Sequence, residues 1–205
     1  MKTHRQPASR AFTLLELLLV ITIITLLASL AAMQIIRSLD DANRLKVMAV
    51  VLELKSDIDA YQFEYSRFPI ASNAPAGDQD APELLTDGST PLVDALLGIP
   101  PGESGVRDLN PKRIPFSSFP TAKNDRHGLV GVARPYKLND MWGQPYHILL
   151  DTNGDNQVTN PDMANADPKV SQNRAAHLAS RVAIYSSGKD QLPQTADDIV
   201  SWRSR

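Results

Sequence analysis

Three carboxylates near the C-terminus are the residues of this sequence most able to bind an ion. Asp190, Asp197 and Asp198 surround one short loop between two β-prone segments. Ca²⁺ takes about six to eight oxygen ligands, from carboxylates and from main-chain carbonyls, and a loop that closes on itself presents both. Because the chain contains no cysteine, a bound ion would also supply a cross-link that disulfides cannot. The loop therefore predicts a structural Ca²⁺ site; the alternative is a solvated acidic turn in which Asp198 caps a strand.

A second oxygen-rich segment has the spacing of an EF-hand-like loop. Asp151, Asn153 and Asp155 occupy the first, third and fifth positions of such a loop. Asn156 stands where Gly makes the sharp turn, although Asn tolerates left-handed geometry. Asp162 replaces the bidentate Glu, and its shorter side chain would hold an ion less well. The favoured interpretation is a hairpin turn rich in Asp, Asn and Gly, and a metal site is the weaker one.

No catalytic arrangement is present among the histidines and serines. His4, His127, His147 and His177 share no ligand spacing with each other or with acidic residues. Ser187 lacks a nucleophile elbow, and neither an HExxH helix nor a phosphate-binding glycine loop occurs. His147 is interpreted as an exposed or packing residue of a strand. The formal net charge of −2 offers no basic surface for nucleic acid. The sequence therefore predicts a protein that is not an enzyme and does not bind nucleic acid.

One further carboxylate, Glu16, precedes a long apolar segment. Residues 17–36 carry no formal charge, and about 20 apolar residues suffice for a helix to cross a bilayer. A charge at that depth is costly, so Glu16 requires a partner or a function. The segment follows the basic residues Lys2, Arg5 and Arg10, which keep that side cytoplasmic. We expect a single-pass protein with a transmembrane helix over about residues 14–36.

The helix that would carry Glu16 extends well beyond the apolar segment. Neither Gly nor Pro occurs between Phe12 and Tyr65, so nothing interrupts a helix there. In its second part an apolar face recurs at alternating steps of four and three, at Val47, Val51, Leu54, Ile58, Tyr61 and Tyr65. The pattern predicts one helix over residues 12–66, with an amphipathic part (37–66) that packs on a domain. Two helices joined by a hinge are the alternative.

Residues 67–205 predict a small head domain whose strands come late. Three short β-prone runs, bounded by Gly, Asp and Asn, cover residues 146–150, 182–186 and 199–202. Residues 92–97 predict a short helix that Gly98 ends. Residues 71–91 predict a loop, and residues 99–138 predict an inserted surface loop. The fold class is therefore α+β, a long N-terminal helix packed on a small antiparallel sheet.

The N-terminal segment resembles the signal of type IV prepilins and of the pseudopilins of type II secretion. A basic leader (residues 1–11) ends at Ala11, where the family usually has Gly, and Phe12-Thr-Leu-Leu-Glu16 opens the apolar helix. The resemblance implies cleavage between Ala11 and Phe12, N-methylation of Phe12, and a role for Glu16 in assembly. Residues 140–146 (Asp-Met-Trp-Gly-Gln-Pro-Tyr) and the acidic loop resemble the major G-type pseudopilins, whose calcium loop has the same acidic spacing.

Two other interpretations of the N-terminus stay open. An ordinary secretory signal would be cut near residues 29–31, but it leaves Glu16 and the length of the apolar segment unexplained. A plain signal anchor would make Glu16 incidental.

The resemblance implies a function and a location. The chain would be a structural subunit of a type II secretion pseudopilus, a helical filament of copies of itself, with a type IV pilin-like fold. Implied partners are membrane lipid, the prepilin peptidase, the inner-membrane assembly platform and minor pseudopilins. The precursor would cross the inner membrane once, with a cytoplasmic N-terminus and a periplasmic head, and would then enter the periplasmic pseudopilus.

Two alternative functions remain. One is a type IV pilus subunit used in adhesion, motility or DNA uptake; the acidic loop and the absence of a cysteine pair favour secretion instead. The other is a membrane-anchored, calcium-dependent binding module, which would not need Glu16.

Overall fold

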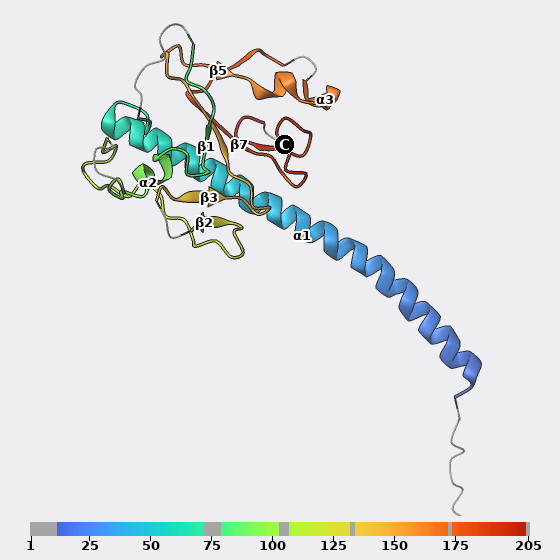
Figure 1. Cartoon of the computed structure of the whole chain (residues 1–205). Coiled ribbons are helices and arrows are strands. Elements are labelled where there is room, and N and C mark those ends of the chain that lie inside the picture. Colours follow the sequence, from blue (N-terminus) through green and yellow to red (C-terminus); the bar gives the residue numbers. More distant parts are fainter. Residues whose placement is uncertain (1–11, 72–78, 103–106, 132–133, 172–173, 204–205) are drawn as a thin grey trace, which may run out of the picture. The chain divides into compact units, whose positions relative to one another are not determined.

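The computed structural model describes residues 12–71, 79–102, 107–131, 134–171 and 174–203. Its longest element is the helix α1 (Leu14–Tyr65), which contributes to two compact units, residues 1–42 and residues 43–205 (Figure 1). In the first unit, every side chain from Phe12 to Leu30 is exposed. Within the described residues, no helical stretch combines the length and the apolar character needed to span a membrane.

A four-stranded antiparallel sheet forms the centre of the head, with the strand order β1–β4–β7–β8. The strands are β1 (Leu84–Leu85), β4 (His147–Leu150), β7 (Val182–Ser186) and β8 (Ile199–Val200). The central pair, β4 and β7, places Ile148 opposite Ile184. The three predicted β-prone runs are these last three strands. The edge strand β1 lies in a segment predicted to be a loop, because two residues are too few to show the alternation of a strand.

The hydrophobic core lies between this sheet and residues 43–65 of α1, which belong to the second unit with the head. The predicted apolar face is buried there, from Val47 to Tyr61, and only Tyr65 remains partly exposed. It packs with sheet residues that include Ile148, Val182 and Ile184. Burying one such aliphatic side chain is worth about 1.5–3 kcal/mol, so packing fixes this part of the helix more strongly than helix propensity does. The predicted α+β fold, a long helix on an antiparallel sheet, is confirmed.

Smaller elements surround the sheet. Two short ladders pair β2 (Gly128–Val130) with β3 (Lys137–Asn139) and β5 (Val158–Thr159) with β6 (His177–Leu178). The short helices are α2 (Leu92–Leu96), the 3₁₀-helix η1 (Pro161–Ala164) and α3 (Pro168–Ser171). Gly98, with a φ of +71°, follows α2 as the predicted glycine stop. Apart from Asn139, the ladder β2–β3 lies inside residues 99–138, so part of the stretch predicted to be an inserted loop is strand.

Candidate functional site

The predicted processing and assembly site lies at the start of α1. Ala11 falls outside the described residues, and Phe12 is the exposed residue that follows it. Thr13 caps the helix, because its Oγ1 accepts the main-chain N–H of Glu16 at 3.2 Å and its carbonyl accepts the N–H of Leu17. Thr13 and Glu16 have the spacing of a capping box, which marks the start of a helix in the sequence.

Glu16 lies in the first turn of α1, where the positive end of the helix dipole favours a carboxylate. Its side chain is exposed in the single copy. No described cation forms an ion pair with Glu16. The carboxylate is therefore open to a group from outside the described part of this copy.

The acidic loop between β7 and β8 is organised around Asp197. The Oδ2 atom of Asp197 accepts the main-chain N–H groups of Lys189 at 2.7 Å and of Asp190 at 3.1 Å. Gly188 lies beneath this carboxylate with a φ of +67°, and a Cβ atom there would come within 2.5 Å of Oδ2. Gly188 is therefore required both by its conformation and by the close approach of Asp197. Burial acts to raise the pKa of Asp197, but hydrogen bonds from Thr195, Asp190 and Lys189 hold it below its ordinary value.

The other two carboxylates of the loop have different environments. Asp198 is buried, and it accepts the main-chain N–H of Gln194 at 2.9 Å and the hydroxyl of Thr195 at 3.2 Å. Burial raises the pKa of Asp198 to about 6, although these hydrogen bonds act in the opposite direction. Asp190 is exposed and accepts the N–H of Leu192 at 2.9 Å.

The donor chemistry of this loop fits Ca²⁺, because every side chain in the set offers oxygen. The arrangement in a single copy is a hydrogen-bonded one, in which main-chain N–H groups satisfy Asp190 and Asp197. Across the described ranges, no three His, Asp or Glu side chains converge as a metal ion would require. A cation bound here would therefore have to replace some of these hydrogen bonds.

The second oxygen-rich segment forms a turn closed by its own main chain. Asp151 accepts the N–H groups of Gly154 at 2.7 Å and Asn156 at 3.0 Å. Asn153 and Asp155 each accept the N–H of the residue two positions on. Asn156 has a φ of +62°, the left-handed geometry expected of an Asn that stands in for Gly. These contacts are those of a turn, as predicted, but not of a hairpin, because the flanking strands β4 and β5 belong to different sheets.

Asp162, the last member of the proposed EF-hand-like pattern, is engaged elsewhere. It is buried and accepts the indole N–H of Trp202 at 2.8 Å, and it pairs with Arg203 at 3.0 Å. The carboxylate thus ties η1 to the segment after β8.

A hydrogen-bonded chain across three strands was missed by sequence reasoning. His147 contacts Glu83 through Nδ1, and its Nε2 atom lies 3.0 Å from Ser187 Oγ. The hydroxyl of Tyr185 donates to the same carboxylate at 2.8 Å. The order Ser–His–Glu is that of a hydrolase triad. Ser187 is only 2% exposed, however, so no substrate reaches its Oγ. We interpret these hydrogen bonds as a structural link between β1, β4 and the acidic loop. The bonded residues are 40 and 64 positions apart in the sequence, so no local sequence pattern predicts the link.

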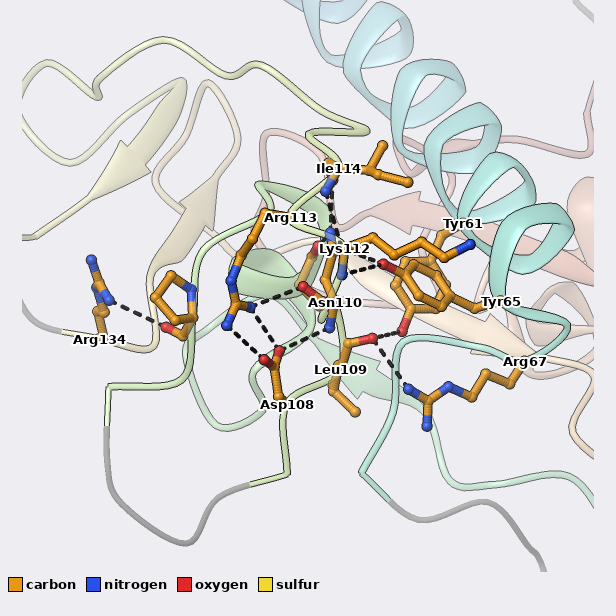
Figure 2. Close-up of polar contacts among 12 residues, drawn as sticks. Tyr61, Tyr65, Arg67, Asp108, Leu109, Asn110, Lys112, Arg113, Ile114 and Arg134 are labelled. Atoms are coloured by element: carbon orange, nitrogen blue, oxygen red, sulfur yellow. Dashed lines mark hydrogen bonds and ion pairs between the residues drawn. The ribbon is translucent and has the colours of Figure 1, made fainter.

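A second polar cluster fastens residues 108–114 to the end of α1 (Figure 2). The hydroxyl of Tyr61 donates to the carbonyl of Leu109, and Tyr65 donates to Asn110 Oδ1 at 2.5 Å. Arg67 adds a bond to the same Leu109 carbonyl at 3.3 Å. Periodicity identified the two tyrosines as apolar stripe residues, but it could not reveal that their hydroxyls hold this segment.

Asn110 is the centre of this cluster. It is fully buried, and its Nδ2 atom donates at 2.7 Å to the carbonyls of Ala95, in α2, and of Ile114. Together with the bond from Tyr65, these contacts satisfy the buried amide. Asp108 and Arg113 pair at 2.6 Å on the outer side. Residues 108–114 are therefore a structured part of the head, joined to α1 and to α2.

Comparison with known proteins connects the start of α1 with a family. The family described as "Prokaryotic N-terminal methylation motif" matches residues 7–32, which include Ala11, Phe12 and Glu16. "Type II secretion system core protein G" of Klebsiella michiganensis is 27% identical over 198 residues, which cover 97% of this chain and 96% of that protein. These two similarities support a pilin-like protein of the G-type pseudopilin kind. No solved structure matches this pseudopilin.

Recognition of the pseudopilin from its N-terminal motif is thereby confirmed. The similarity extends over the whole head as well as the signal. The cleavage position, the methylation of Phe12, the role of Glu16 and the metal ligands remain predictions for this chain.

Proposed function

We propose that this pseudopilin is a structural subunit of a type II secretion pseudopilus, a filament that assembles through the apolar half of α1 and drives protein export. The observation that carries the proposal is similarity over nearly the full length to a type II secretion core protein G, together with the methylation motif over residues 7–32. The likeness to a core protein of a secretion system supports a role as a building block and not as an enzyme.

The proposed route begins at the inner membrane. The apolar segment from about residue 14 to residue 36 crosses it once, with the leader in the cytoplasm and the head in the periplasm. A prepilin peptidase cuts after Ala11, and the new amine of Phe12 is methylated. An assembly platform and minor pseudopilins then start the filament, into which each copy moves from the lipid.

Glu16 supplies the specificity of assembly in this proposal. An isolated carboxylate in an apolar surrounding is costly, and a cation within ion-pair distance relieves that cost. The amine of Phe12 in a neighbouring copy is such a cation. The exposed side chains from Phe12 to Leu30 then pack against the same segment of other copies.

Deleting the chain from its host is expected to stop secretion of folded proteins to the medium while surface pili persist. The measurement compares exported enzyme activity with shed pilin, and complementation with the wild-type chain is the control. Loss of surface pili with normal secretion would instead identify a type IV pilus subunit. If the deletion strain has normal secretion and normal pili, the chain is not a required subunit of either filament.

We further propose that the acidic loop binds Ca²⁺, with Asp190, Asp197 and Asp198 as side-chain ligands. Support comes from three carboxylates in one loop, from main-chain oxygens in the same loop, and from the absence of any disulfide that could hold the head. An ion there would join the ends of β7 and β8.

Calcium is expected to raise the melting temperature of the full chain in detergent. At about 100 times the dissociation constant, binding adds about 2.7 kcal/mol, which corresponds to about 5–10 °C for a chain of this size. Asp197→Ala should abolish the increase, and Asp155→Ala, in the other oxygen-rich segment, is the matched control. An increase that is lost only in Asp155→Ala would move the ion to that segment. If calcium does not raise the melting temperature of the wild-type chain, neither segment binds the ion.

A further inference from the structure

The turn between β4 and β5 contains the only Asn-Gly dipeptide of the sequence, Asn153-Gly154. The amide carbon of an Asn side chain can be attacked by the main-chain nitrogen of the next residue, and a side chain on that residue hinders the attack. The nine other asparagines all precede a residue larger than Gly. Gly154 is exposed, and a Cβ atom there would meet nothing within 4 Å. The nitrogen of Gly154 is therefore open to this reaction.

The side chain of Asn153 is folded back toward the peptide that would attack it. Its Oδ1 atom accepts the main-chain N–H of Asp155 at 2.9 Å, which makes an Asx turn over Gly154. The N–H of Asn153 itself donates to Asp80 Oδ1 at 3.3 Å and fixes the start of the turn. A donor at Oδ1 stabilises the negative charge that develops on this oxygen when a nucleophile adds to Cγ.

A carboxylate holds the N–H group on the other side of the reaction. The N–H of Gly154 donates to Asp151 Oδ1 at 2.7 Å. Asp151 is only 2% exposed, and its Oδ2 atom accepts the N–H of Asn156 at 3.0 Å, so the carboxylate is fixed in place. A carboxylate in this position can take the proton as the nitrogen forms its new bond. The turn thus brings a nucleophile, a base and an oxyanion donor to one side-chain amide.

We propose that Asn153 is a site of self-modification, at which the folded head converts the amide to aspartate or isoaspartate. The nitrogen of Gly154 bonds to Cγ of Asn153, and its proton passes to Asp151. The bond from Cγ to Nδ2 then breaks, and ammonia leaves with the proton that Gly154 released. Water opens the resulting succinimide at one of its two carbonyls. Both products carry one additional negative charge, and isoaspartate also lengthens the main chain of the turn.

The reaction needs one folded copy and no filament, so this inference stands apart from the proposed function. The purified full chain is incubated in detergent at neutral pH, and its peptides are followed by mass spectrometry. Asn153 is expected to convert at least about tenfold faster than Asn156, because only Asn153 has an unhindered nitrogen held beside it. Asn156 is the matched control, since it is exposed in the same turn but precedes Gln157. Equal rates at the two positions, or no conversion of Asn153, would overturn the inference.

Asp151→Asn tests whether the fold assists the reaction. The variant keeps the size of the side chain and removes the base, so conversion of Asn153 in the folded chain should be at least about tenfold slower. In denaturant the two chains should convert at the same rate, because the contacts of the turn are lost. Asp151→Glu, which keeps a carboxylate, should recover part of the folded rate. Equal folded rates for the wild type and Asp151→Asn would refute the role of Asp151.

A second variant keeps the test decisive if Asp151→Asn does not fold, which its melting curve shows. Gly154→Asn places a side chain beside the attacking nitrogen. Gly154 has a φ of +83°, and Asn tolerates this left-handed geometry, so the turn is retained. Conversion of Asn153 should again be at least about tenfold slower than in the wild type. An unchanged rate would show that the nitrogen of residue 154 is not the nucleophile.

Discussion

Glu16→Gln is expected to leave the chain processed normally but unable to assemble. The substitution keeps the size of the side chain and the capping bond that the main-chain N–H of residue 16 gives to Thr13. It removes the charge that would pair with the Phe12 amine of a neighbour. A carboxylate in the centre of a membrane costs about 2.5–3.5 kcal/mol. Glu16 lies near the start of the apolar segment, so this cost is an upper bound, and its pairing is worth up to a factor of about 100 in subunit affinity. Because every added copy loses this contact, filaments should fall below detection.

Two measurements and one control make this experiment decisive. N-terminal sequencing of the variant should find methylated Phe12, as in the wild type, while the amount of sheared filament falls. Glu16→Asp keeps the charge on a shorter side chain and should retain part of the assembly. Normal filaments from Glu16→Gln would refute the pairing. A wild-type chain that keeps Met1, or one that starts at Thr13 or later, would refute the proposed processing.

The sequence was most informative where a pattern repeats. The buried face of α1 was predicted residue by residue from Val47 to Tyr61, because helical periodicity and burial are two aspects of the same packing. The strands β4, β7 and β8 were predicted because β-branched and aromatic residues cluster between turn residues. The strand β1 was not, since its position depends on pairing with β4, more than 60 residues away.

Side-chain function was harder to predict than the fold. The hydroxyls of Tyr61 and Tyr65 hold residues 109 and 110, but their place in the apolar stripe concealed this. His147 was interpreted as an exposed or packing residue. It stacks on Tyr185 with 4.3 Å between ring centroids, and it also joins Glu83 to Ser187. Such contacts depend on which distant segments the sheet brings together, and composition does not encode that directly.

The side-chain contacts of the acidic loop were also not predictable from the sequence. The spacing of Asp190, Asp197 and Asp198 placed three carboxylates in one loop between strands, and they lie there. The spacing did not predict their different environments. Asp197 accepts main-chain N–H groups beside Gly188, whereas Asp198 is buried. The three carboxylates therefore differ in how much their ionisation changes the free energy of unfolding, and this difference can be measured.

Asp198→Asn is expected to stabilise the chain near pH 7.5 in the presence of a chelator. Burial raises the pKa of Asp198 from 3.8 to about 6. Between these values the native state binds more protons than the unfolded state, so the free energy of unfolding falls as the pH rises. Above about pH 6 the whole cost is present, at about 3 kcal/mol for about two units. Asn carries no charge, and it can still accept the N–H of Gln194.

The pH and calcium dependence of this variant identify the cause of its effect. Without calcium, most of the advantage of Asp198→Asn should be lost by pH 4, where the wild-type carboxyl is protonated in the native state and about half protonated in the unfolded state. An advantage of equal size at pH 4 and at pH 7.5 would show that ionisation is not its source. With calcium, the wild type should gain stability that the variant does not, because the carboxylate that is costly when buried alone becomes a ligand. If calcium makes the wild type more stable than Asp198→Asn, the ionised carboxylate of Asp198 serves as a ligand of the ion.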